Sequence, residues 1–236
     1  MMIAGVQLVV HSPLLNVQFP GNAFVIYEEL IGMVTYEFLP TSDIFPDYFH
    51  FPSSGSLNDR FERLDYGSFY SIMLLGCIFL VIVWMLLLYV VYLLLLSCCK
   101  FQWPKKVLRY LRKTLFWKQW IVFTYATFLE LFICSLIQAK ISHEDWLYSK
   151  SVFASFLIWI LVMVLIFYLL IVSFCIVLPK YAREGKTEAH MKKYSVILDE
   201  MNDKRGYAPM LVHISYYSRR IALAIVCIFW NEKPLF

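Results

Sequence analysis

The apolar residues of this chain lie in long blocks separated by short polar stretches. The clearest block, residues 69–97, lies within residues 66–99, which carry no charged side chain. About 20 apolar residues form a helix long enough to cross the roughly 30 Å hydrocarbon core of a bilayer. This block is longer than that and leaves room for tilt. The pattern predicts an integral membrane protein.

Three further blocks predict spans at residues 119–138, 152–178 and 209–230. The first is interrupted only by Glu130, and the second is followed by Pro179, a common helix stop. The third is weaker because two arginines lie in its middle. The expected fold is therefore an all-α, polytopic transmembrane helix bundle with about four spans.

The N-terminal part is expected to differ from the bundle. Residues 1–68 are predicted to form a hydrophobic or interfacial segment followed by an external loop, and residues 69–230 to form the bundle. Within the first part, residues 22–39 are apolar but contain three glutamates, so an interfacial or protein-packed helix and a fifth span both stay open. Residues 40–68 are rich in turn-forming residues and predict an ordered loop.

Composition supports the membrane assignment and limits the partners. The chain is 61% hydrophobic and 16% charged, against roughly 45–50% and 25% in a soluble domain. Its net charge of +4 is small and localised, so a nucleic-acid partner is not expected. The six cysteines lie in or beside apolar blocks, unlike a secreted disulfide framework.

Basic residues alternate between the connections. The connection 98–118 carries seven basic and no acidic residues, and 179–208 carries seven basic and five acidic. The connection 139–151 has two basic residues, and residues 1–68 have two against eight acidic ones. Because cytoplasmic loops are enriched in lysine and arginine, 98–118 and 179–208 are predicted to be cytoplasmic, and 40–68 and 139–151 to be outside. Whether the membrane is the plasma membrane or an endomembrane stays open.

The first cytoplasmic connection has two candidate membrane contacts. Its basic residues predict an amphipathic helix on anionic inner-leaflet lipids, although ordinary orientation charges explain them equally: Lys105, Lys106, Arg109, Arg112 and Lys113. Cys98 and Cys99 at the membrane edge are candidates for palmitoylation, with unmodified thiols as the alternative.

Charged residues inside the blocks are the candidate functional positions. Glu130 in a span is costly unless it is protonated or paired, so it is expected to face protein or water. It marks either an ion or proton pathway, or a packing contact with His213, Arg219, Arg220 or a tyrosine hydroxyl. The two arginines could instead line a vestibule or mark the start of a span near residue 218.

No catalytic constellation is found in the sequence. There is no nucleophile elbow, zinc-binding spacing or phosphate-binding loop. The sequence therefore predicts a protein that is not an enzyme, with no catalytic residue, cofactor or metal.

Several stretches resemble a known family. They are LVVHSPLLNVQFPGNAF, YEFLPTSDIFPDYFHF, NDRFERLDYGSFYSIMLLG, LFWKQWIVFTYATFLELFICSLIQ and YYSRRIALAIV. They resemble the C-terminal membrane region of ciliate multi-pass proteins that carry cysteine-rich, furin-like or EGF-like repeats outside the cell. That region is loosely similar to transient-receptor-potential-like membrane domains. The resemblance implies that this chain is a fragment, a short paralogue or a truncated gene product.

Two functions are consistent with this resemblance. The first is a non-enzymatic membrane protein that anchors an extracellular module or couples it to the cytoplasm. The alternative is a subunit of a transient-receptor-potential-like cation channel, for which Glu130 would lie near a pore. Homo- or hetero-oligomers are compatible with both functions, and the lipid bilayer is the one partner that both require.

Overall fold

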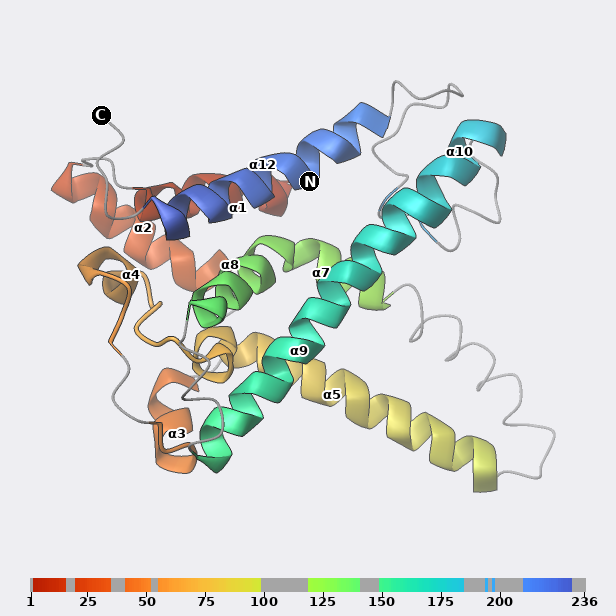
Figure 1. Ribbon diagram of the computed structural model, residues 1–236, viewed down its shortest axis with the longest axis horizontal. Coiled ribbons are helices and arrows are strands. Elements are labelled where there is room, and N and C mark those ends of the chain that lie inside the picture. The colour runs from red at the N-terminus through yellow and green to blue at the C-terminus, as the bar shows by residue number, and fades with distance from the viewer. Residues whose placement is uncertain are drawn as a thin grey trace. The chain divides into compact units, whose positions relative to one another are not determined.

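The structure is a computed structural model that describes residues 2–15, 20–34, 41–51, 55–98, 119–140, 149–184, 194, 197 and 210–230. Within these ranges the regular structure is helical, without strands, which confirms the all-α prediction. Figure 1 shows the helices α1 (Met2–Val10), η1 (Ser12–Leu14), α2 (Gly21–Val34), α3 (Thr41–Tyr48), α4 (Asp59–Arg63), α5 (Ser71–Cys98), α7 (Trp120–Ala126), α8 (Phe128–Ala139), α9 (Lys150–Ile171), η4 (Val172–Val177), α10 (Leu178–Glu184) and α12 (Met210–Phe229).

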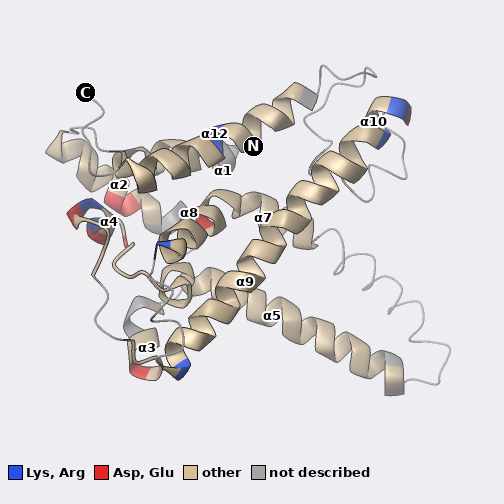
Figure 2. Ribbon diagram, in the orientation of Figure 1, with Lys and Arg blue, Asp and Glu red and all other residues tan. Residues whose placement is uncertain are grey.

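Apolar helices occupy all four predicted spans. Three helical stretches in the described residues are long and apolar enough to cross a membrane: Ser71–Leu95, Lys150–Glu184 and Leu211–Phe229. Helices α7 and α8 are long and apolar enough only together, and they make a fourth if the bent pair is a single span. Figure 2 shows no charged residue along α5 and a basic one only at the start of α9, where the sequence has Lys150. The chain is therefore an integral membrane protein with several spans.

The second span is not one straight helix, as residues 119–138 had predicted. Helices α7 and α8 meet at Thr127 with a bend of 68°. The Thr124 hydroxyl donates a 2.7 Å hydrogen bond to the carbonyl of Trp120, a contact that often bends helices. A threonine back-bond one turn before the break thus accompanies the bend.

Pro179 does not end the third span, so this prediction was wrong. The helix continues through α10 to Glu184. Proline lacks an N–H group and crowds the carbonyl four residues earlier, here that of Cys175. The π-helical turn η4 contains Cys175, and its wider spacing accommodates the ring.

Helix α5 is interrupted near its start. Gly76 has φ 44° and ψ −117°, which divides the helix at a kink. A Cβ atom on this residue would lie 2.6 Å from Oγ1 of Thr41 in α3. Glycine is therefore required at this position by both the backbone and the close approach of α3.

The stretch 40–68 is more helical than predicted. It contains α3 and α4 where the turn-forming residues had predicted a loop. The Asn58 side chain caps α4 by accepting hydrogen bonds from the amides of Arg60 and Phe61. The preceding helix α2 has 14 residues, fewer than the roughly 20 that a span needs. Residues 35–39 lie outside the described residues, so the interfacial or protein-packed helix and the fifth span both stay predictions for 22–39.

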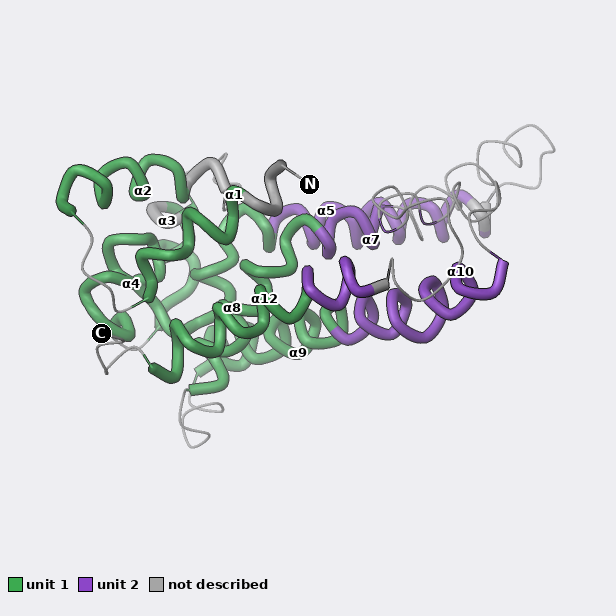
Figure 3. Tube along the Cα trace, turned by 90° about the horizontal axis from the view of Figure 1, so that it is seen from above, with its two compact units in different colours: residues 1–79, 126–166, 217–236 green, residues 80–125, 167–216 purple. Residues whose placement is uncertain are grey.

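The chain divides into two compact units, each built from segments distant in sequence (Figure 3). Unit 1 consists of residues 1–79, 126–166 and 217–236. Unit 2 consists of residues 80–125 and 167–216. In each unit, spans far apart in the sequence contribute to the same core.

Unit 2 has a tyrosine pair in its core. The rings of Tyr125 and Tyr216 stack with centroids 4.3 Å apart. The Tyr216 hydroxyl also donates a 2.8 Å hydrogen bond to the carbonyl of Tyr125. This pair joins α7 to the first turns of α12.

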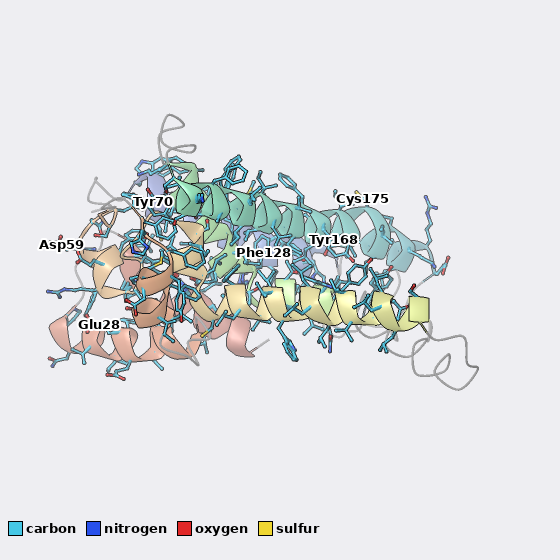
Figure 4. All side chains as sticks on the ribbon, turned by 90° about the horizontal axis from the view of Figure 1, so that it is seen from below. Glu28, Asp59, Tyr70, Phe128, Tyr168 and Cys175 are labelled. Atoms are coloured by element: carbon cyan, nitrogen blue, oxygen red, sulfur yellow. The ribbon has the colours of Figure 1, made fainter. Side chains whose placement is uncertain are left out.

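Unit 1 has an aromatic cluster where α5 begins. Phe51 stacks on Tyr70 with centroids 4.3 Å apart, and Phe49 stacks on Phe51 at 6.2 Å. Phe45 of α3 contacts both Phe49 and Phe79 edge-on. Figure 4 labels Tyr70 at this end of α5. The cluster holds α3 and the segment after it against the start of the first span.

Candidate functional site

The most distinctive site in unit 1 surrounds Glu130. This residue lies in the first turn of α8, where the partial positive charge of a helix N-terminus favours a carboxylate. Its exposed fraction is 2%. Glu130 is therefore removed from lipid and water and has to be satisfied by other side chains.

Two side chains contact one oxygen of this carboxylate. The Tyr66 hydroxyl donates a 2.8 Å hydrogen bond to Oε2, and Nε2 of His11 lies 3.0 Å from the same oxygen. His11 Nε2 and Tyr66 Oη are 2.9 Å apart, which closes a triangle. The other oxygen, Oε1, accepts a weak hydrogen bond from the Cys134 thiol at 3.6 Å. We call His11, Tyr66 and Glu130 the carboxylate cluster.

Proton counting shows that the His11–Glu130 pair is electrically neutral. His11 Nδ1 lies 2.7 Å from the carbonyl of Gln7, and because a carbonyl only accepts, Nδ1 carries a proton. Nε2 and Oε2 can approach to 3.0 Å favourably only with a proton between them. The pair is then either imidazolium with carboxylate or imidazole with carboxylic acid, and both have zero net charge.

Helix α1 holds His11 in place. The His11 amide donates to the carbonyl of Gln7, and the side chain of Gln7 donates a 2.9 Å hydrogen bond to the carbonyl of Ala126. That carbonyl lies immediately before the break at Thr127. Gln7 therefore satisfies a carbonyl group at the bend while the same helix presents His11 to Glu130.

A helix C-terminal motif directs Tyr66 to the same point. Asp65 has φ 63°, the Asp65 amide donates to the Glu62 carbonyl, and the Tyr66 amide donates to the Phe61 carbonyl at 2.7 Å. These are the two hydrogen bonds of a Schellman motif. The rings of Phe61 and Tyr66 contact edge-on at 5.9 Å, the apolar contact that commonly accompanies the motif.

Two titrating groups next to this motif have raised pKa values. Burial, and then the charge of Glu130, raise the pKa of Tyr66 well above its usual value, so its hydroxyl remains a donor. Partial desolvation of the carboxyl, and then Glu28 of α2, raise the pKa of Asp65, although the residue is exposed overall. The C-terminal turn of α4 thus places the Asp65 carboxylate where its negative charge is unfavourable.

Known proteins do not assign this site. No family model matches the chain, and no significant match was found among curated proteins or solved structures.

One of the partners that the sequence suggested for Glu130 contacts it in the structure. A tyrosine hydroxyl is a partner, as one alternative predicted, and the residue is Tyr66. His213 is fully buried in unit 2, where its ring lies 6.4 Å from that of Tyr125. On α12, Arg219 is exposed whereas Arg220 is 2% exposed.

Sequence reasoning missed His11. The residue stands alone in an apolar stretch of the N-terminal segment, and that isolation was the one available signal. A histidine among apolar residues needs a polar partner, and an intramembrane glutamate needs one too. Considering these two requirements together would have indicated a contact between His11 and Glu130.

A second polar cluster in unit 1 caps α5 from other helices. Oε1 of Gln138 accepts hydrogen bonds from the Ser71 amide at 2.7 Å and from the Ser155 hydroxyl at 3.0 Å. The Ser155 hydroxyl is 3.5 Å from the Ile72 amide, which donates to it. The first amides of a helix have no partner within it, so α8 and α9 here supply the cap for α5.

Other predicted positions lie outside the described residues. These are Cys99, Lys105, Lys106, Arg109, Arg112 and Lys113, most of both connections predicted to be cytoplasmic, and the side chain of Cys98. In the described ranges, no three His, Cys, Asp or Glu side chains are placed to hold a metal ion.

Proposed function

We propose that this chain is a non-enzymatic membrane module that anchors an extracellular segment and couples it to the membrane spans. The proposal rests on the burial and the hydrogen bonds of the Glu130 carboxylate. Its carboxylate is buried and bonded to His11 and Tyr66, with the thiol of Cys134 on its other oxygen. A buried carboxylate with these partners holds together segments that are distant in the sequence.

The segments that Glu130 joins support the coupling role. His11 follows α1 and Tyr66 precedes α5, so both belong to residues 1–68, of which the charge pattern predicts the stretch 40–68, with Tyr66, to be outside. Glu130 belongs to α8, which together with α7 covers the second predicted span. A force or displacement applied to residues 1–66 would therefore act directly on α8. The resemblance to ciliate proteins with extracellular cysteine-rich repeats supports the same role.

A channel subunit would need a different arrangement. A cation pathway requires carboxylates or carbonyls that face water. Three side chains surround the buried Glu130 carboxylate, so it does not line such a pathway. This arrangement favours the anchoring function over the channel function. Currents across bilayers containing the purified full chain should therefore match those of empty bilayers, and Glu130→Gln should change nothing. A cation conductance that Glu130→Gln reduces would contradict the proposal.

Coupling can be tested separately by cutting the chain between the two joined parts. Gly55 is exposed and has open space around it, so a protease site inserted after it should be cleavable in the folded protein. After cleavage in mild detergent, the fragment ending at Gly55 should remain bound in the wild type. His11→Ala should release it about tenfold faster, which corresponds to about 1.4 kcal/mol. Tyr48→Phe, at an exposed position, is the control. Equal release rates would contradict the coupling role.

A further inference from the structure

One arginine of α12 is exposed where lipid tails would surround it. Arg219 is exposed and forms no ion pair with another residue in the described part of the chain. At the end of the helix, Trp230 is 49% exposed and Lys140 Nζ lies 5.9 Å from the ring centre of Phe229. Aromatic and lysine side chains of this kind mark the membrane interface.

The depth of Arg219 follows from helix geometry. At 1.5 Å per residue, Arg219 lies about 16 Å along α12 from Trp230. The hydrocarbon core is about 30 Å thick, so Arg219 lies near its middle. A charged side chain at this depth faces protein or water in stable membrane proteins, and it pairs with an opposite charge.

The surface around Arg219 has a shape that suits another helix. Ser218 precedes it and Ala222 follows three residues later on the same side, and both are small and exposed. Small residues on a membrane helix allow the backbone of a second helix to come close. We call Ser218, Arg219 and Ala222 the arginine face.

We propose that the arginine face docks a membrane-spanning helix of another polypeptide that carries a carboxylate near the bilayer midplane. Charge complementarity selects this occupant. Glu130 is unavailable because it is buried in the carboxylate cluster. A second copy packed through the same face by two-fold symmetry would place Arg219 against Arg219, and like charges repel strongly in a low dielectric. This surface is independent of the anchoring role proposed above.

The test uses the full chain in phosphatidylcholine vesicles with synthetic apolar helices about 20 residues long. One helix carries glutamate at its centre, and matched helices carry glutamine or leucine. Energy transfer between labels on the chain and the peptide measures association. The glutamate helix should bind the wild type on the order of tenfold more tightly than the leucine helix.

Variants separate charge from shape. Arg219→Leu should abolish the preference for the glutamate helix, and Arg219→Lys should keep most of it. Ala222→Leu should weaken binding of all three peptides, because the larger leucine side chain would keep the partner helix from approaching the arginine face closely. Val164→Leu, at an exposed position of α9, is the control and should leave binding unchanged.

Three outcomes would overturn the proposal. The first is equal binding of all three peptides by the wild type. The second is that the chain associates with itself, that Arg219→Leu abolishes this self-association, and that the wild type does not prefer the glutamate helix. The partner would then be a second copy of the chain. The third is an effect of Arg219→Leu seen only when phosphatidylglycerol is added, because Arg219 would then reach a lipid headgroup.

Discussion

The hydroxyl of Tyr66 donates a 2.8 Å hydrogen bond to the carboxylate of Glu130, although 64 positions separate the two residues in the sequence. Tyr66 lies just before the first span and Glu130 lies within the second. The contact therefore joins the approach to the membrane to a helix inside it.

Removing the charge of Asp65 should stabilise the protein at neutral pH. The pKa of Asp65 is raised in the folded state, so the stability linked to its protonation is present below the ordinary value of 3.8 and is lost as pH rises through the folded value. Asp65→Asn keeps a residue that tolerates positive φ and should raise the free energy of unfolding at pH 7 by less than about 1 kcal/mol.

The pH dependence distinguishes this charge effect from a change in backbone preference. The advantage of Asp65→Asn should shrink as the pH falls toward 3.8, measured by unfolding in mixed micelles. An advantage that stays constant from pH 7 down to that value would show that the charge of Asp65 is not responsible.

Gly76→Ala should destabilise the start of α5. Alanine would need a positive φ and would bring its Cβ to 2.6 Å from Oγ1 of Thr41. The expected loss in the free energy of unfolding is about 1–3 kcal/mol. Gly67→Ala is the matched control, since a Cβ at Gly67 meets nothing within 4 Å. Adding Thr41→Ala should recover the steric part of the loss, and no recovery would place the whole cost in the backbone.

Gln138→Met should release the cap that α8 supplies to α5. Methionine has a similar shape but cannot accept the hydrogen bonds from the Ser71 amide and the Ser155 hydroxyl. Leaving these buried donors unpaired should cost about 1–3 kcal/mol of unfolding free energy. Gln119→Met, at an exposed position, should cost far less. Equal effects of the two substitutions would mean that the cap does not stabilise α5.

The long apolar blocks predicted the spans well because each block is a local property of the sequence. A helix in lipid needs only enough consecutive apolar residues, and residues 69–97 supply them. The bend at Thr127, the kink at Gly76 and the continuation past Pro179 were not predicted. Each depends on contacts or helix geometry that a hydropathy pattern does not contain, such as the approach of Thr41 to Gly76.

The candidate site was predicted in part. Glu130 was identified because a charge inside an apolar block is conspicuous. Its partners were not, because His11 and Tyr66 are 119 and 64 positions away and reach it through an N-terminal helix and a Schellman turn. The turn depends on a positive φ at Asp65, a residue type that gives only a weak signal for that conformation.

The orientation of the spans is open to a direct test. The charge pattern predicts that a tag inserted after Lys186 is cytoplasmic and that one inserted after Asp145 is outside. In sealed cells or vesicles of known orientation, external protease should remove the second tag and spare the first. The reverse protection pattern would mean that the orientation of every span is opposite to the prediction.

The central claim, that Glu130 fastens the N-terminal segment to a span, is tested most directly by a double-mutant cycle with Tyr66→Phe and Glu130→Met. The free energy of unfolding of the wild type, both single variants and the double variant is measured in mixed micelles, with Tyr48→Phe as the control. Buried polar contacts between membrane segments predict a coupling energy of about 0.6–1.7 kcal/mol between positions 66 and 130. Additive effects, within about 0.3 kcal/mol, would contradict the account.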